Sequence, residues 1–376
     1  VTAGITTVQA LQATTGTFSS TGSFGGDVTV NSVSVGEGAG SVSGNTVVGA
    51  TALDANTTGA SNTAIGFGAL TETTTGSSNT SVGRLSLASN VTGQQNTAVG
   101  KGTLNANLAS DNTAVGMNAM LNNTTGANNT AVGLSALLTN TTSSSNTAVG
   151  YNALLSNTTG YNGVAVGKDA LYANTTGANN IAIGVDTLDN NTTGSSNNAI
   201  GYGALGANTT ANSNTAIGHV ALTSNTTGTA NVAVGAEALD ANTTASNNTA
   251  VGKSAMGSNT TGANNTAVGQ AALATNVTSS GNTAVGRAAL SATTGDSNTA
   301  VGNGALENNS SASSNTAVGK DALYTNTTGT QNVAVGAQAL DACTTASYNT
   351  AVGYQALTAS TTAIVSTAIG WGALSS

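Results

Sequence analysis

From residue 45 onward, the sequence consists of closely related units that follow one another at a fixed interval. The units begin at Asn45, Asn62, Asn79, Asn96, Asn112, Asn129, Asn146, Gly163, Asn180, Asn197, Asn214, Asn231, Asn248, Asn265, Asn282, Asn298, Asn315, Asn332, Asn349 and Ser366. The step is 17 residues, except for two steps of 16 that start at Asn96 and Asn282. A fixed period of this kind is the signature of a repeat protein, in which each unit packs against its neighbours.

The unit that begins at Asn129 illustrates the pattern, with Asn129 counted as position 1. It reads Asn-Thr-Ala-Val-Gly-Leu-Ser-Ala-Leu-Leu-Thr-Asn-Thr-Thr-Ser-Ser-Ser. Position 5 is glycine in all twenty units, position 4 is valine or isoleucine, and position 9 is leucine or methionine. Positions 3 and 8 are almost always small, and position 12 is usually asparagine.

A helical repeat and a β-solenoid are the two architectures to weigh. A pair of units would match the period of a helical hairpin, but Asn, Thr, Ser and Gly are poor helix formers. Thr130, Ala131 and Val132 instead alternate with period 2, which is typical of a strand. The sequence therefore predicts an all-β chain, a parallel β-solenoid of about twenty 17-residue turns over 45–376. Turns spaced ~4.8 Å apart would form a rod on the order of 95 Å long.

The pattern also predicts where each position of a turn lies. Positions 2 and 4 are expected to face a dry interior, with the leucine of position 9 as the inward residue of a second strand. The glycine of position 5 marks a corner with positive φ. Stacked asparagines at positions 1 and 12 are expected to form amide ladders, and the threonines of positions 13 and 14 hydroxyl ladders.

So thin a core predicts association between chains. Two large aliphatic side chains in each turn bury too little apolar surface to offset the conformational entropy lost by 17 ordered residues. Additional burial is therefore needed, and the small residues of positions 3 and 8 are the candidate seam between chains. We expect a homotrimer around one axis.

Composition excludes several classes of protein. Charged residues make up 5% of the chain and the net charge is −8, which disfavours nucleic acid as a partner. The single cysteine excludes a disulfide framework, and no apolar run reaches the ~18 residues of a membrane span. The sequence lacks an initiator methionine and stops within a unit at Ser376, so we expect a fragment or a processed product, with further chain beyond Ser376.

Two known families carry similar repeats. Asn180-Ile-Ala-Ile-Gly184 and Asn231-Val-Ala-Val-Gly235 resemble the head repeats of YadA-type trimeric autotransporter adhesins, which build a left-handed parallel β-roll. The longer unit, with its Ala-Leu and Asn-Thr-Thr-Gly segments, is similar to repeats of phage tail fibres, cyanophage ones in particular. Both resemblances cover 45–376 and imply a homotrimeric fibre on a virion tail or a cell surface. The implied partners are copies of the chain, other virion or tail proteins, and a host surface glycan or protein bound by this shaft or by a tip.

Residues 1–44 follow another pattern and predict an N-terminal connector. Ile5, Val8 and Leu11 are spaced as in a short helical or coiled-coil turn, and 27–35 alternates like a strand. This Gly-, Ser- and Thr-rich β pattern resembles connector segments of phage fibres, in which three chains interwind. It favours a phage fibre over a bacterial adhesin.

The exceptional side chains gather at position 6, directly after the corner glycine. A possible surface-contact stripe comprises Phe67, Arg84, Lys101, Tyr151, Lys168, Tyr202, His219, Lys253, Arg287, Lys320, Tyr354 and Trp371. One interpretation is a row that touches glycans or a cell surface, with Trp371 as the best single candidate. The other is a solvated edge that tolerates any residue and aids solubility.

No pattern of catalytic or metal-binding residues emerges, and we expect neither an enzyme nor a cofactor. Cys343 replaces an asparagine at position 12 without a histidine in register, and His219 stands alone. The favoured function is the structural and adhesive shaft of a phage tail fibre that mediates host attachment. A bacterial adhesin head is the alternative, and an ice-binding β-solenoid, suggested by the threonine rows, is the second alternative.

Overall fold

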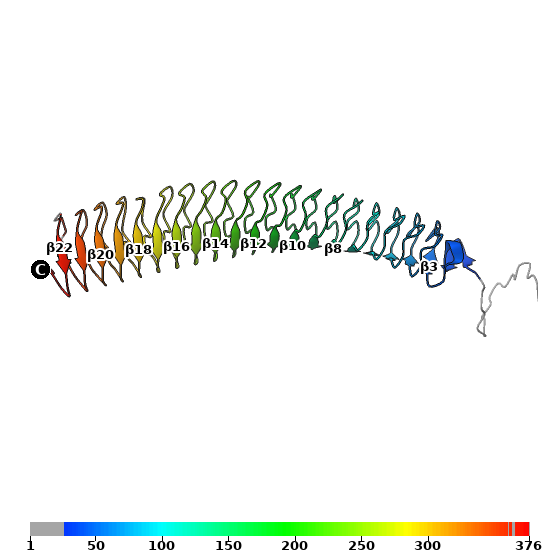
Figure 1. Cartoon of the computed structure of the whole chain (residues 1–376), viewed down its shortest axis with the longest axis horizontal. Helices are drawn as coiled ribbons and strands as arrows, with labels where there is room; N and C mark the ends of the chain where they lie inside the picture. The colour runs from blue at the N-terminus through cyan, green and yellow to red at the C-terminus, as the bar shows by residue number, and fades with distance from the viewer. Residues whose placement is uncertain (1–25, 360, 363–364, 376) are drawn as a thin grey trace, which may run out of the picture.

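The computed structural model describes residues 26–359, 361–362 and 365–375. Figure 1 shows a long, gently curved rod, in which each turn of the chain stacks on the one before it. The predicted helical turn at Ile5, Val8 and Leu11 lies outside the described residues. The predicted all-β, parallel β-solenoid is confirmed, since one three- or four-residue strand recurs in every unit from 45 to the C-terminal end.

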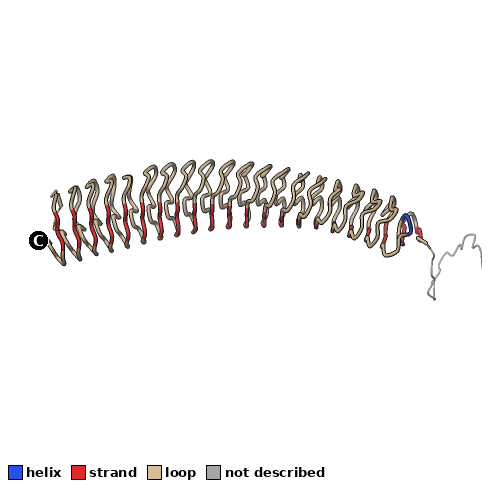
Figure 2. The backbone as a smooth tube through the Cα atoms, viewed as in Figure 1, coloured by secondary structure: helices blue, strands red, loops and turns tan. Residues whose placement is uncertain are grey.

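The strands of the solenoid stack in register. They are β3 (Thr46–Gly49), β4 (Thr63–Ile65), β5 (Thr80–Val82), β6 (Thr97–Val99), β7 (Thr113–Val115), β8 (Thr130–Val132), β9 (Thr147–Val149), β10 (Val164–Val166), β11 (Ile181–Ile183), β12 (Asn198–Ile200), β13 (Thr215–Ile217), β14 (Val232–Val234), β15 (Thr249–Val251), β16 (Thr266–Val268), β17 (Thr283–Val285), β18 (Thr299–Val301), β19 (Thr316–Val318), β20 (Val333–Val335), β21 (Thr350–Val352) and β22 (Thr367–Ile369). Each pairs in parallel with the next, position for position. They form a single row along the rod, and loops make up the rest of each turn (Figure 2).

The predicted direction of the strand side chains is wrong. Position 3 faces the interior: Ala199 is fully buried, whereas its neighbour Ile200 at position 4 is 39% exposed. Positions 2 and 4 therefore form the outer face of the sheet. The physical reason is the thinness of the rod, because an alanine is all that fits between the sheet and the loop opposite it.

The loop opposite the sheet supplies the rest of the core. The alanine of position 8 and the leucine of position 9 are buried in nearly every turn, as Ala204 and Leu205 are. Position 9 does not lie in a second strand as predicted, because Leu205 has a φ of 53° and the segment around it is a turn. Positions 3 and 8 are therefore part of the interior and not the seam between chains. The serine pair of one turn shows their contact, with Ser81 Oγ 2.5 Å from Ser86 Oγ.

The corner glycines are confirmed. Gly66 has a φ of 130°, a conformation that side chains strongly disfavour. A Cβ built there would lie 2.6 Å from the carbonyl oxygen of Gly83 in the next turn. Position 5 therefore requires glycine for two reasons, its dihedral angle and the close approach of the next turn.

Two buried asparagine ladders run along the solenoid, as predicted, with interruptions at Gly163 in the first and at Thr73, Thr293 and Cys343 in the second. At position 1, Asn129 Oδ1 accepts the backbone N–H of Asn146 at 2.9 Å. At position 12, Asn191 Nδ2 donates to Asn174 Oδ1 at 2.8 Å and to the carbonyl oxygen of Gly194 at 3.0 Å. The threonines of position 13 differ from the prediction, since their hydroxyls donate to backbone carbonyls of the next turn. These side-chain bonds add to the backbone–backbone hydrogen bonds that join the loops of consecutive turns, so most of the buried polar groups of the loops are satisfied.

The two short turns are accommodated outside the sheet. Asn107 Nδ2 donates to the carbonyl oxygen of Ala109, two residues on, whereas the usual interval is three residues. The missing residue is therefore one of the outer pair at positions 13 and 14. Register is kept, with Thr97 opposite Thr113 and Thr283 opposite Thr299.

Residues 26–44 cover the N-terminal end of the rod. β1 (Val28–Val30) and β2 (Val33–Gly36) form an antiparallel hairpin, and β2 continues antiparallel onto β3. The turn between them contains Asn31 and Ser32, both with positive φ, so 27–35 is not one continuous strand. The short helix η1 (Ala39–Ser41) lies over the first turn, where the Ala39 N–H donates to the Leu53 carbonyl.

Candidate functional site

The predicted surface-contact stripe lies along one exposed edge of the rod, directly beyond the corner glycines. All twelve of its side chains are exposed, from Phe67 near one end to Trp371 near the other. They share position 6, so members from adjacent turns, such as Tyr202 and His219, lie side by side, whereas members separated by two or more turns, such as Lys101 and Tyr151, do not meet. The stripe is therefore a set of short clusters and not one continuous surface.

Neighbouring members of the stripe stack on each other. The rings of Tyr202 and His219 lie 5.6 Å apart at an interplanar angle of 15°, and those of Tyr354 and Trp371 lie 6.5 Å apart at the same angle. The Arg84 guanidinium lies 5.7 Å from the centre of the Phe67 ring. These contacts align the side chains along the rod axis, with one face of each stacked ring turned toward its neighbour.

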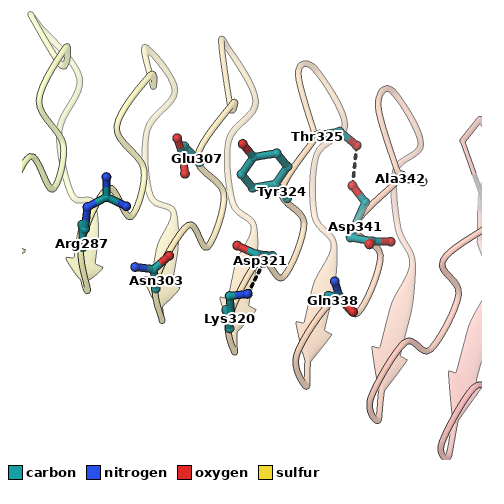
Figure 3. Close-up of a pocket in the computed structure, with 10 residues that line it drawn as sticks. All are labelled: Arg287, Asn303, Glu307, Lys320, Asp321, Tyr324, Thr325, Gln338, Asp341 and Ala342. Atoms are coloured by element: carbon teal, nitrogen blue, oxygen red, sulfur yellow. Dashed lines mark hydrogen bonds and ion pairs between the residues drawn. The ribbon is translucent and has the colours of Figure 1, made fainter.

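Two open grooves extend from this stripe across positions 7 and 10. The larger has a volume of about 540 Å³. It is lined by Arg287, Asn303, Glu307, Lys320, Asp321, Tyr324, Thr325, Gln338, Asp341 and Ala342. In Figure 3, Tyr324 lies in a row between Glu307 and Asp341, with Lys320 and Gln338 in the row below. Lys320 Nζ is 3.3 Å from Asp321 Oδ2.

The smaller groove lies in an equivalent place nearer the N-terminus. It has a volume of about 390 Å³ and is lined by Tyr151, Asn152, Lys168, Asp169, Tyr172, Asp186 and Asp189. Lys168 Nζ forms an ion pair of 2.7 Å with Asp169 Oδ2 and a longer one of 3.8 Å with Asp186 Oδ1. The hydrogen bond to Asp169 is the main reason that the pKa of Lys168 is raised.

Both grooves contain a carboxyl group that is partly removed from water. Burial raises the pKa of Asp189, and the neighbouring Asp186 charge adds to this effect. Burial likewise raises the pKa of Asp341, with a further contribution from Asp321. Such groups favour a hydrogen-bond donor or a positive charge as a ligand, since either would replace part of the lost hydration.

Sequence reasoning missed the grooves because they include positions 7 and 10 beside the stripe. Single acids at these positions are also what an ordinary solvated surface carries. A signal was nevertheless present, since Lys-Asp is followed by a tyrosine at position 10 in two units only, those that begin at Gly163 and Asn315.

Cys343, the single cysteine, lies in the interior of the rod and not in a groove. Cys343 is buried at position 12, where its Sγ lies 3.7 Å from the carbonyl oxygen of Ala346, and burial raises the pKa of its thiol. In the described residues, no three His, Cys, Asp or Glu side chains are arranged to hold a metal ion. No helix in the same part of the chain is long and apolar enough to cross a membrane.

A comparison with models of known protein families found no match, and a comparison with curated proteins found none either. The functional argument consequently depends on the geometry of the rod and of its surface.

Proposed function

We propose that this chain is the structural and adhesive shaft of a homotrimeric surface fibre, namely a phage tail fibre that mediates attachment to a host. The observation that carries the proposal is the uninterrupted ladder of strands from β3 to β22, which keeps its register even across the two short turns. A rod of this kind separates its two ends by a fixed distance. That is the mechanical task of a fibre shaft.

The outer face of the sheet supports association of chains. Positions 2 and 4 carry threonine, valine and isoleucine, and the position-4 residues Ile183, Ile200 and Ile217 are each more than a third exposed. An antiparallel or solenoid sheet with one solvated face usually shows polar residues there, and large exposed apolar patches mark interaction surfaces. We therefore assign the seam to positions 2 and 4, in place of positions 3 and 8.

Mass and cell binding test the proposal together. Mass photometry should give three times the chain mass of 35.8 kDa, and the fluorescently labelled fibre should be retained by host cells. Ile200→Glu should weaken the trimer by introducing three facing charges into the seam, whereas Thr210→Glu, at exposed position 14 of the same turn, should leave it intact. A stable monomer at micromolar concentration would refute the shaft as a trimer.

The two alternatives predict other outcomes. A bacterial trimeric adhesin head would share the trimer and its seam but would be expressed on a bacterial surface and not on a virion. An ice-binding solenoid would show thermal hysteresis. Its suggested threonine array is weakened by position 13, where hydroxyls such as that of Thr175 are engaged by the carbonyl of the next turn.

A further inference from the structure

Two units, nine turns apart, carry the same four groove residues in the same register. Lys168 and Asp169 of the first correspond to Lys320 and Asp321 of the second, at positions 6 and 7. The tyrosines at position 10, Tyr172 and Tyr324, are shared by these two units alone. In the following turn, position 10 is aspartate in both cases, Asp189 and Asp341. A solvated edge that tolerates any residue does not explain why this combination recurs as a set.

At each place, the shared residues line an open groove. The groove volumes of about 540 and 390 Å³ fall in the range of small-molecule sites. Tyr324 is half-buried and Tyr172 is 41% exposed, so part of each side chain stays open to a ligand. Figure 3 shows carboxylates on both sides of Tyr324, at Glu307 and Asp341.

The charges of the grooves limit what they can bind. The first groove to occur in the chain has one cation, Lys168, against the three carboxylates of Asp169, Asp186 and Asp189. The second has Arg287 and Lys320 against three carboxylates. The two lysines are also already paired with the aspartates beside them. Both grooves are therefore net negative and would repel an anionic ligand.

Carbohydrate meets these conditions. The apolar C–H face of a sugar ring can pack on a tyrosine ring, and its hydroxyls are donors for carboxylates and for the amide oxygens of Asn303 and Gln338. An apolar peptide would instead leave the carboxylates unsatisfied, at considerable cost in free energy.

We propose that the two grooves are equivalent binding sites for saccharide units without acidic groups. This inference rests on the proposed function as an attachment fibre and names its ligand class and its contact residues. Nine turns separate the sites by roughly 43 Å at ~4.8 Å per turn, so one polysaccharide or neighbouring surface glycans could engage both. Weak binding at each site would then be multiplied by avidity, more so in a trimer.

The test uses the full chain and two matched double variants. Tyr172→Ala/Tyr324→Ala removes the two tyrosine rings on which the sugar rings are proposed to pack. Tyr161→Ala/Tyr348→Ala removes two tyrosines of the return turn, which are 52% and 59% exposed and lie outside the grooves. Circular dichroism and mass photometry establish that both variants keep the fold and the assembly of the parent chain.

The probes are immobilised neutral hexose and N-acetylhexosamine oligomers, with uronic acid oligomers of equal length. We expect binding to at least one neutral series and none to the uronic acids. The groove variant should bind about tenfold more weakly or worse, as expected for loss of a buried aromatic contact, and the control should bind like the parent.

Each result decides the matter. Equal binding by the groove variant, preference for uronic acids, or no binding to any neutral series would overturn the saccharide sites. Failure of the proposed function is seen separately, as a monomeric mass or absence of host-cell retention. A trimer that binds host cells equally well with and without the two tyrosines would support the proposed fibre shaft and rule out the grooves as its saccharide-binding sites.

Discussion

The residues that pack directly on their counterparts in the next turn, at positions such as 5, 9 and 12, form columns along the rod, which we call the buried columns. They share one period with the stripe at position 6 but tolerate substitution very differently. Positions 5 and 9 vary hardly at all, with glycine in the first and leucine or methionine in the second. Position 6 holds lysine, arginine, tyrosine, tryptophan, alanine, valine and others. The difference follows from the stacking, because a buried residue contacts its own copy above and below, while a residue at position 6 projects into water.

The buried columns hold the turns together, whereas the exposed positions can vary and carry contacts with a partner. A buried column propagates its constraint from turn to turn, so one poor residue disturbs two interfaces. An exposed position is independent of its neighbours except where consecutive turns pair, as Tyr202 and His219 do. Specific recognition can therefore be placed in single turns without disturbing the shaft.

The largest expected effect comes from truncating a side chain within a buried column. Leu205→Ala removes a fully buried side chain and should lower the free energy of unfolding by about 2–5 kcal/mol. Tyr202→Ala in the same turn removes a larger side chain that is 54% exposed, and we expect a change of less than about 0.5 kcal/mol. Urea unfolding at a fixed protein concentration measures both. Equal losses from the two variants would show that burial does not determine how well a position tolerates substitution.

Much of the fold was predictable because each position of the unit has the same surroundings in every turn. The residue types that those surroundings require therefore recur through the twenty units. The period, the parallel strands, the corner glycines and the asparagine ladders all follow from residues that hardly vary. These are features in which each residue meets a copy of itself, and local chemistry alone determines the contact.

The inward direction of the strand was not predicted, because it depends on the distance across the rod. Large aliphatic residues at positions 2 and 4 suggest a core, but the leucine of position 9 approaches from the opposite side and leaves room only for alanine at position 3. Two signals could have corrected this. Asn198 is a polar residue at position 2, and Ser81 and Ser86 replace alanine together in one turn, as residues in contact do.

A smaller effect should come from repairing a buried column. Cys343 interrupts the position-12 ladder, and the preceding Asn326 Oδ1 is buried without a hydrogen-bond partner among the described residues. Cys343→Asn supplies an amide that can donate to Asn326 Oδ1 and to the Ala346 carbonyl, as Asn191 does to its own partners. We expect a gain of about 1 kcal/mol in the free energy of unfolding.

The control for this repair is Cys343→Ala, which removes the thiol but leaves Asn326 Oδ1 unpaired. It should not stabilise the protein. Hydrogen exchange of the backbone amides around β19 and β20 would locate the gain. If both variants raise the free energy of unfolding equally, the gain does not come from the restored hydrogen bonds of the ladder. Position 12 would then tolerate substitution better than a buried column should.

The smallest expected effect lies at the border between buried and exposed, where Asp240 occupies position 10. Burial raises the pKa of Asp240, and the neighbouring Glu237 charge adds to it. The folded protein then keeps this proton to a higher pH than the unfolded chain does. Its contribution to stability is complete below the unfolded pKa and is lost as the pH rises through the folded pKa.

Asp240→Asn removes this titration and should therefore stabilise the protein at pH 7 but leave its stability unchanged at pH 3. The gain should stay below about 1 kcal/mol, because the carboxyl group is only partly buried and water screens its charge. Urea unfolding of parent and variant at both pH values measures the difference. A gain at pH 3 as large as that at pH 7 would mean that packing and not charge limits position 10, which would place it with the buried columns and not with the surface.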